Sequence, residues 1–279
     1  MKALVEQGAW VIACCYTEEG RKAALAAGAK LAPRLDLSDS SSIEELVAEV
    51  KEHCTGGLWG LVHNAGTALP GFVEFQRLEN YRYVMEVNFF GVVALTRRLL
   101  PLLKPTKGRV VIVSSVDGIV SLPGNAPYDA SKFAVEAYAD ALRVELSIWN
   151  VHVSVINPST LKTPLALGFF EKEIETWENM EKAEPEGEWK ETWTREWLEE
   201  YVKVNTERLK RMAQEPRHAI HDILHALNAI RPKLRYLSGT FAKTFFYALW
   251  KMPEHWSLNV KKGMLQPLPP VKEPSKKSS

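Results

Sequence analysis

Two kinds of apolar pattern alternate along this chain. Short runs rich in Val and Ile predict β-strands, which cover residues 9–15, 30–35, 58–64, 108–115 and 151–157, with a short last strand at 235–239. Longer runs with apolar residues every three or four positions predict helices, among them residues 17–28, 40–54 and 131–149. This alternation predicts an α/β fold with a Rossmann-like, doubly wound parallel sheet in a single domain.

The pattern changes over residues 162–211, where a charged segment carries Trp177, Trp189, Trp193 and Trp197. Its aromatic side chains can line an apolar pocket, which would favour an apolar substrate over a sugar. Alternatively, the last three tryptophans are spaced by four and can dock a helix against the domain. Residues 266–279 are rich in Pro, Ser and Lys, a composition that predicts a disordered tail.

Tyr128 and Lys132 carry the clearest chemical signal. They lie four positions apart in a predicted helix and share one face, so we expect the Lys132 ammonium to lower the pKa of the Tyr128 phenol from about 10. Such a pair can exchange a proton with a carbonyl or alcohol oxygen while hydride moves at the adjoining carbon. Ser115 follows a predicted strand, and its hydroxyl can hydrogen-bond the same oxygen. Without Ser115, the spacing would favour a routine contact on a helix surface.

These residues resemble the signature of the short-chain dehydrogenase/reductase superfamily, in which a Ser precedes Tyr-x-x-x-Lys and both follow an Asn and an Asn-Ala-Gly strand end. The resemblance runs from Met1 to about Trp256. The sequence is similar in particular to the branch that contains retinol dehydrogenases, 17-beta-hydroxysteroid dehydrogenases and 3-hydroxybutyrate dehydrogenase. It implies a short-chain dehydrogenase domain over residues 1–265, in which residues 162–211 cover the substrate.

The resemblance also implies roles for individual residues. The implied catalytic residues are Asn88, Ser115, Tyr128 and Lys132, with Asn88 anchoring a water that links Lys132 to solvent. The residues implied to contact the cofactor are Asp36, Asn64, Ala65, Gly66, Tyr128, Lys132, Pro158 and Thr163. Among these, Asp36 would lie near the adenine and Lys132 would hold the nicotinamide ribose.

Two departures from the superfamily pattern concern the cofactor. Members begin with a strand and a Gly-rich turn of the TGxxxGxG kind, whose backbone N–H groups face the pyrophosphate. This sequence begins with MKALVEQGAWVIACC and offers no such turn, so we expect a sheet without the first strand and its turn. The second departure is Ser159, which stands where the pattern has Gly after Pro158.

The cofactor implied by the resemblance is NAD, with NADP as the alternative. Cys14, Cys15, Tyr16 and Thr17 follow the second strand of the superfamily pattern, and they include neither an Asp for a ribose 2′-hydroxyl nor an Arg for a 2′-phosphate. Arg21 and Lys22 lie a little further along the chain, which keeps NADP open.

Composition limits the partners and the compartment. A net charge of +1 offers no field for nucleic acid, and no apolar run is long enough to span a bilayer. The aromatic cluster over residues 241–250 predicts either contact with a membrane surface or packing on the domain. Three cysteines without a Cys-x-x-Cys pair favour an intracellular location. The candidates are the endoplasmic-reticulum surface, the cytoplasm and the mitochondrion. The first is a candidate because Lys276 and Lys277 resemble a dilysine retrieval signal.

Two functional hypotheses result. The first is an oxidoreductase that transfers hydride between a nicotinamide cofactor and an apolar alcohol or carbonyl compound of the steroid or retinoid class, and the resemblance implies a homodimer. The second is a non-catalytic fragment or binding protein that kept the chemical residues but lacks the dinucleotide cradle. The purified chain's affinity for NAD and NADP discriminates between them.

Overall fold

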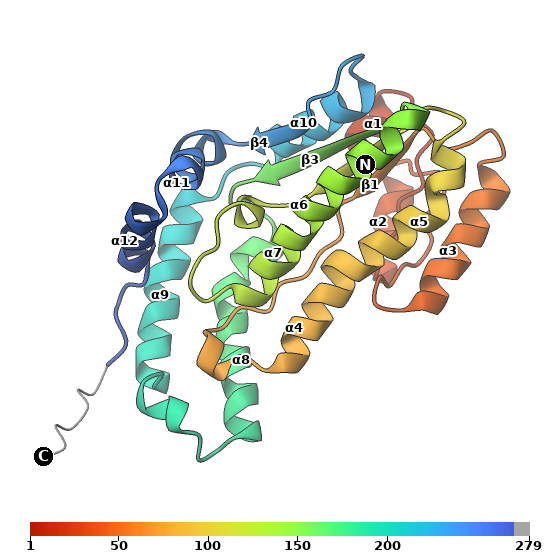
Figure 1. Cartoon of the computed structure of the whole chain (residues 1–279). Coiled ribbons are helices and arrows are strands. Elements are labelled where there is room, and N and C mark those ends of the chain that lie inside the picture. Colours follow the sequence, from red (N-terminus) through yellow and green to blue (C-terminus); the bar gives the residue numbers. More distant parts are fainter. Residues whose placement is uncertain (271–279) are drawn as a thin grey trace, which may run out of the picture.

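The computed structural model describes residues 1–270 of the chain. Its centre is a four-stranded parallel sheet in the order β1-β2-β3-β4 (Figure 1). The strands are β1 (Gly60–His63), β2 (Arg109–Val113), β3 (His152–Pro158) and β4 (Arg235–Ser238). Parallel neighbours need long crossover connections, and the helices between the strands supply them. The predicted Rossmann-like α/β fold is confirmed.

Helices cover both faces of this sheet. Side chains alternate along a strand, so Val110 and Ile112 of β2 pack into one layer and Val111 packs into the other. The first layer consists of α3 (Ser40–His53), α5 (Gly91–Leu103) and α6 (Ala126–Leu146), and the second of α1 (Lys2–Glu6) and α10 (Arg217–Asn228). In Figure 1, α5 and α6 run in front of the sheet. The sheet is therefore doubly wound, as predicted.

Two predicted strands do not form. Residues 9–15 and 30–35 meet only at isolated bridges, which join Ile12 to Leu31 and Cys15 to Arg34. Within residues 1–270 no strand pairs with the outer edge of β1. The two segments therefore have no sheet to extend, and a pair of short strands is at best marginally stable by itself. The helix predicted between them is present as α2 (Glu18–Ala26), and the side chain of Thr17 caps it.

Residues 162–211 form a helical cap beyond the carboxyl ends of the strands. Its elements are α7 (Pro164–Leu167), α8 (Phe169–Ala183), η5 (Glu188–Glu191) and α9 (Arg195–Met212). Helices α8 and α9 pack side by side in the direction in which the strand arrows point (Figure 1). Trp189 and Trp197 are buried with Phe72 and Phe75 in one aromatic cluster. The prediction that these tryptophans dock the segment onto the domain is confirmed.

The end of the described chain also packs on the domain. After β4 come η6 (Ala242–Phe246), α11 (Tyr247–Lys251) and α12 (Glu254–Met264), and Phe246 and Leu249 are buried against Val116. This confirms packing as the role of the buried members of the 241–250 cluster. Among residues 1–270, no helix combines the length and the apolar composition needed to cross a membrane.

The first two residues of the predicted tail contact the helical cap. Backbone oxygens of Gln266 and Pro267 accept hydrogen bonds from Asn205 Nδ2 at 3.0 Å and from Trp197 Nε1 at 3.1 Å. These two residues are therefore held by α9, a long-range contact that composition does not reveal. The rest of the predicted tail, including Lys276 and Lys277, falls largely in residues 271–279, which lie outside the described residues.

The remaining elements are short. They are η1 (Val73–Phe75), α4 (Leu78–Met85), η2 (Glu86–Phe90), η3 (Val116–Gly118) and η4 (Ser147–Trp149). Of these, η2 is a single π-helical turn between α4 and α5, and a π-turn of this kind is frequent at functional sites.

Candidate active site

Ser115, Tyr128 and Lys132 come together beyond the carboxyl end of β2. Ser115 follows that strand by two residues and caps η3, while Tyr128 and Lys132 lie on the first turns of α6. The Lys132 ammonium is 5.4 Å from the centre of the Tyr128 ring and donates a hydrogen bond to the backbone oxygen of Val113 at 3.0 Å. The helix therefore places the phenol and the amine beside the end of the strand that carries the serine.

The loop before Tyr128 is fixed by Asp129. Its carboxylate accepts hydrogen bonds from the backbone N–H of Leu122 and from Asn125 Nδ2, both at 2.7 Å. Pro127 occupies the first turn of α6, where its missing N–H leaves no intrahelical bond unmade. Burial and the charge of Asp117 raise the pKa of Asp129 to about 9. The position of the phenol is thus set by local hydrogen bonding at the start of its helix.

Lys132 is buried, and this determines its acidity. Burial lowers the pKa of Lys132 to about 8, while the nearby carboxylates of Glu136 and Asp117 oppose the decrease. The ammonium form still predominates at neutral pH, because about one unit separates that pH from the pKa. Lys132 therefore supplies a positive charge inside the site.

The expected decrease in the pKa of Tyr128 is not what the structure shows. Burial raises the pKa of the phenol, and the negative charges of Asp117 and Asp129 raise it further, while hydrogen bonding by Ser115 opposes the change. One N–H of Lys132 donates to the backbone oxygen of Val113, and desolvation of the phenolate outweighs its attraction to the ammonium. The Tyr128 phenol is therefore neutral in this state.

Asn88 ties three parts of the site together from the π-helical turn η2. Its Oδ1 accepts from the backbone N–H of Thr67 at 2.8 Å, and its Nδ2 donates to the backbone oxygen of Thr67 at 2.8 Å. The same Nδ2 donates to Ser131 Oγ at 2.9 Å, and Ser131 Oγ donates to the backbone oxygen of Tyr128 at 2.7 Å. Asn88 thus connects the loop after β1 to the helix that carries Tyr128 and Lys132.

Three residues of the site were missed by the sequence reasoning. Asp117 exchanges hydrogen bonds with Ser115, accepting from its hydroxyl at 3.2 Å and donating its backbone N–H to that oxygen at 3.1 Å. Asn157 donates to the backbone oxygen of Ser115 at 2.8 Å, and Ser131 joins Asn88 to α6. Asp117 could have been identified from the sequence, because a carboxylate two residues after a serine at a strand end can accept a hydrogen bond from the serine hydroxyl.

The loop after β1 passes close to Lys132 and Asn88. Asn64, Ala65 and Gly66 follow β1 and are exposed. A Cβ at Gly66 would lie 3.3 Å from Asn88 Oδ1 and 3.6 Å from Lys132 Nζ. The lack of a side chain therefore lets this loop approach the site closely, and the residues present fit the nicotinamide ribose half of a dinucleotide.

The other predicted cofactor residues lie at separate places. Pro158 ends β3, and Thr163 caps α7 by accepting a hydrogen bond from the backbone N–H of Ala166 at 3.4 Å. Asp36 accepts hydrogen bonds from the backbone N–H of Ser38 at 2.9 Å and from its hydroxyl at 2.6 Å. Ser159 has no positive φ, so a residue other than Gly is accommodated there. The described residues supply no Gly-rich turn beside β1 for a pyrophosphate.

The sequence also matches a family model described as short chain dehydrogenase over residues 1–174. The chain belongs to the short-chain dehydrogenase family. This match includes Ser115, Tyr128 and Lys132 and ends before most of the helical cap.

Curated relatives extend the similarity over most of the chain. Retinol dehydrogenase 16 of Mus musculus is 35% identical over 259 residues, which cover 90% of this chain and 80% of that protein. The 17-beta-hydroxysteroid dehydrogenase type 6 of Rattus norvegicus is 34% identical over 261 residues, with the same coverage of 90% and 80%. These similarities take in the cap as well as the signature residues.

A solved structure agrees with the fold. The short chain dehydrogenase of Burkholderia cenocepacia J2315, determined in complex with NADP, matches with a TM-score of 0.64 at 21% identity. The match covers 95% of this chain and 91% of that one. At this identity the likeness concerns the fold, and it includes both the sheet and the cap.

Proposed function

We propose that this chain is an oxidoreductase that transfers hydride between a nicotinamide dinucleotide and an apolar alcohol or its carbonyl counterpart, of the steroid or retinoid class. The observation that carries the proposal is the meeting of Ser115, Tyr128 and Lys132 at the carboxyl end of β2, where ligands bind in parallel α/β sheets. The names of the retinol and hydroxysteroid dehydrogenases among the relatives support the substrate class.

The residues of the chain divide the proton chemistry among them. Tyr128 donates its proton to the carbonyl oxygen in the direction of reduction, a role that suits a phenol kept neutral by burial. The Ser115 hydroxyl turns from Asp117 to the same oxygen and holds it in place. The Lys132 cation stabilises the phenolate that remains. A bound nicotinamide supplies or accepts the hydride.

Binding of the cofactor and control of water fall to the residues around Lys132. Lys132 holds the nicotinamide ribose, the loop Asn64–Gly66 borders it, and Asn88 anchors a water that links Lys132 to solvent. Asn88 is 2% exposed and fully engaged by Thr67 and Ser131, so it is rigid enough for that role. NAD is the proposed cofactor, with NADP as the alternative.

The helical cap supports an apolar substrate. Its aromatic cluster is anchored on Phe72, whose ring stacks on Trp193 at 4.4 Å between centres. Phe72 is also close to Gly124, because a Cβ on this glycine would lie 3.5 Å from Phe72 Cζ. Gly124 belongs to the loop that leads into Tyr128. The buried aromatic cluster thus extends from the cap to the loop beside the proposed proton donor.

Steady-state turnover of the purified full chain tests the proposal. With NAD and retinol or a hydroxysteroid as substrates, appearance of reduced nicotinamide is followed by its absorbance. We expect Tyr128→Phe to lower the rate by about 10²- to 10⁴-fold, which is the usual contribution of a general acid or base. Tyr138→Phe, on the same helix and outside the site, is the matched control and retains turnover. Equal rates for wild type and Tyr128→Phe would refute the proposal.

One observation favours a second candidate function. The outer edge of β1 has no strand partner among the described residues, and the described chain shows no turn for the pyrophosphate. A binding protein of the dehydrogenase fold that lacks hydride transfer would have these features. Calorimetric titration of the full chain with NAD and NADP separates the two candidates, because millimolar or undetectable affinity for both would favour the binding protein.

Assembly and location complete the proposal. We propose a homodimer that works inside the cell, at the surface of the endoplasmic reticulum or in the cytoplasm, with the mitochondrion as another candidate. Exposed members of the 241–250 cluster, Phe245 and Tyr247, are the proposed sites of peripheral membrane contact. Sedimentation of the purified chain, alone and with vesicles, tests both statements.

A further inference from the structure

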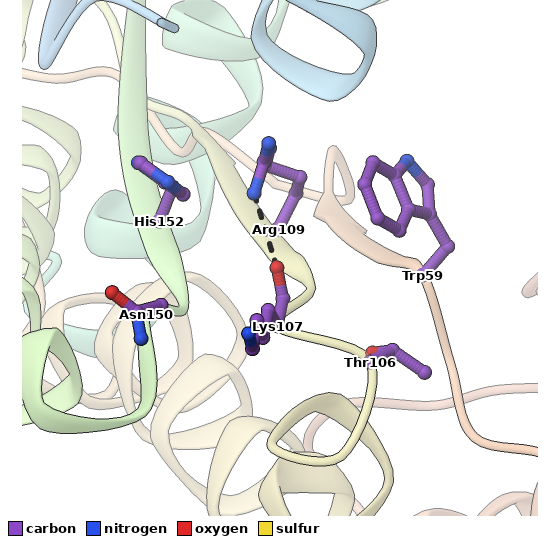
Figure 2. A pocket seen from close by; sticks show the side chains of 6 residues that line it. All are labelled: Trp59, Thr106, Lys107, Arg109, Asn150 and His152. Atoms are coloured by element: carbon purple, nitrogen blue, oxygen red, sulfur yellow. Dashed lines mark hydrogen bonds between the residues drawn. The ribbon is translucent and has the colours of Figure 1, made fainter. Parts of the chain in front are cut away.

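A hollow lies at the amino ends of the strands, at the opposite end of the sheet from the candidate active site. It has a volume of about 460 Å³ and is lined by Trp59, Thr106, Lys107, Arg109, Asn150 and His152 (Figure 2). Arg109 and His152 are the first residues of β2 and β3, and Trp59 directly precedes β1. Strands rise about 3.3 Å per residue, so the seven residues of β3 separate this hollow from Pro158 by about 20 Å.

Arg109 is a buried cation for which residues 1–270 supply no carboxylate partner. Arg109 is 8% exposed, and its Nη1 donates a hydrogen bond to the backbone oxygen of Lys107 at 3.1 Å. Nε is buried with no hydrogen-bond partner, and no bond of Nη2 is present within residues 1–270. Burial of a charge with unmatched donors is unfavourable. A ligand that accepts from these donors would remove that penalty.

The unmatched donors have the geometry for an oxyanion. Nε and Nη2 form one edge of the planar guanidinium, and such an edge binds a carboxylate or phosphate through two parallel hydrogen bonds. Nη1, on the other side, is held by the backbone of residues 107 and 108. The guanidinium is therefore fixed at one side and unmatched at the other.

The surroundings add positive charge and no negative charge. Lys107 lies at the rim (Figure 2), is exposed, and has no ion pair within the described part of the chain. No Asp or Glu lines the hollow. Burial and the charge of Arg109 together lower the pKa of His152, as expected beside an uncompensated cation. The hollow is thus electropositive although the chain as a whole carries a net charge of only +1.

Trp59 gives the hollow one flat apolar wall. The indole is 50% exposed and lies against the Arg109 guanidinium at 4.9 Å from ring centre to Cζ. Its Nε1 donates to the backbone oxygen of Leu227 at 3.0 Å, which anchors the ring on α10. A tethered, half-exposed indole beside a cation can stack against a planar group carried by an anion.

We propose that this hollow is a binding site for a small-molecule oxyanion, a phosphate or carboxylate group carried on a planar apolar body. Arg109 binds the oxyanion through its Nε–Nη2 edge, Lys107 neutralises the second charge at the rim, and Trp59 receives the planar part. The volume suits one small ligand. This site is independent of the proposed hydride transfer, because its residues lie at the other end of the sheet.

Calorimetric titration of the full chain tests the site with defined probes. The probes are phenyl phosphate, benzoate, inorganic phosphate and, as the neutral compound, benzyl alcohol, all at constant ionic strength. We expect phenyl phosphate or benzoate to bind, inorganic phosphate to bind more weakly, and benzyl alcohol not to bind. The comparison of phenyl phosphate with benzoate shows which oxyanion is preferred.

Variants locate the binding. Arg109→Gln and Lys107→Gln should each weaken the binding of phenyl phosphate at least tenfold, and Lys107 is exposed enough that its replacement leaves folding intact. Lys51→Gln, an exposed lysine of α3, is the matched control for loss of one charge. Absence of binding by any anion to wild type would overturn the proposal. The proposal would also be overturned if both single variants, Lys107→Gln and Arg109→Gln, bound phenyl phosphate with the affinity of wild type.

Discussion

At the scale of single residues, burial dominates the chemistry of the candidate active site. Burial raises the pKa of Tyr128 and lowers that of Lys132 to about 8, so each group is shifted toward its neutral form. The charge of Asp117 raises the pKa of both groups. Burial raises the pKa of Asp117 itself to about 6, while Ser115 and Lys132 oppose that increase. The charge of this carboxyl therefore influences the acidity of the proposed proton donor, Tyr128.

Replacement of Asp117 should change the pH dependence of turnover. In Asp117→Asn the negative charge near the phenol is absent, so the pKa of Tyr128 decreases. The rise of alcohol oxidation with pH should then occur at lower pH than in wild type, and each unit of decrease raises the ionised fraction about tenfold below the midpoint. The measurement is the pH profile of kcat. Asp140→Asn, an exposed position of the same helix, should leave the profile in place, and an unchanged profile in Asp117→Asn would contradict the assignment.

At the scale of elements, α6 connects the site to the rest of the sheet. Tyr128, Lys132 and Glu136 follow one another at four-residue intervals on one face of this helix. Glu136 forms an ion pair with Arg235 of β4 and accepts a hydrogen bond from Asn157 of β3 at 2.5 Å. Asn157 in turn donates to the backbone oxygen of Ser115. The face of the helix that carries the proton donor is therefore locked to both neighbouring strands.

Helix α8 of the cap contains a buried acid with an unmatched oxygen. Glu173 is 1% exposed, and its Oε1 has no hydrogen-bond partner among the described residues. Burial raises its pKa well above the usual range. The folded cap therefore binds a proton at pH values at which the unfolded chain has released it. Stability from the protonated carboxyl is complete below the unfolded pKa of about 4.3 and is lost as the pH rises toward the folded pKa.

Glu173→Gln should remove this pH dependence. The amide is neutral at every pH, so the free energy of unfolding of the variant, relative to wild type, should increase by up to about 1.4 kcal/mol per pH unit above pH ~4.3. Urea unfolding from pH 4.5 to 8 measures the difference. Glu175→Gln, an exposed position of the same helix, should run parallel to wild type. Parallel curves for Glu173→Gln would show that the carboxyl ionises freely in the folded cap.

At the scale of the whole molecule, the parallel sheet separates two chemically different ends. The carboxyl ends of the strands carry the proposed proton donor, Ser115 and the cap, whereas the amino ends carry Arg109 and the electropositive hollow. The last residue of β1, His63, is 5% exposed between the sheet and α5. Thr96 donates to the backbone oxygen of Val92, so His63 Nε2 donates to Thr96 Oγ1 at 2.8 Å. The stability of the fold in acid therefore depends on this imidazole, which lies where the sheet meets α5.

Acid should destabilise the fold through His63. Burial lowers the pKa of His63 to about 4, so the stability it provides is complete above the unfolded pKa of about 6.5 and is lost as the pH falls toward 4. Over that range wild type should lose roughly 3 kcal/mol relative to His63→Gln, since one unit of pKa difference equals about 1.4 kcal/mol. Chemical unfolding at a series of pH values measures this. The control His221→Gln, at an exposed position, should show the same dependence of unfolding free energy on pH as wild type. If His63→Gln showed that same dependence, the imidazole would ionise freely in the folded protein.

Much of the fold and the centre of the site could be predicted from local sequence. The Val- and Ile-rich runs at 108–115 and 151–157 became β2 and β3, because a buried parallel strand requires apolar residues on both faces. Tyr128 and Lys132 share a helix face through their spacing alone. The strands expected at 9–15 and 30–35 failed for a non-local reason, since a strand exists only when another strand pairs with it.

By itself, then, the sequence determined the class of fold, the helix that carries Tyr128 and Lys132, and the identity of the groups available for proton transfer. Only the tertiary structure decided the protonation state of those groups, the partnership of Asp117 with Ser115, and the unmatched charge of Arg109 at the far end of the sheet. The physical reason is the range of each interaction. Helix spacing and strand composition act between neighbours in the chain, whereas burial and hydrogen-bond satisfaction depend on residues that only folding brings together.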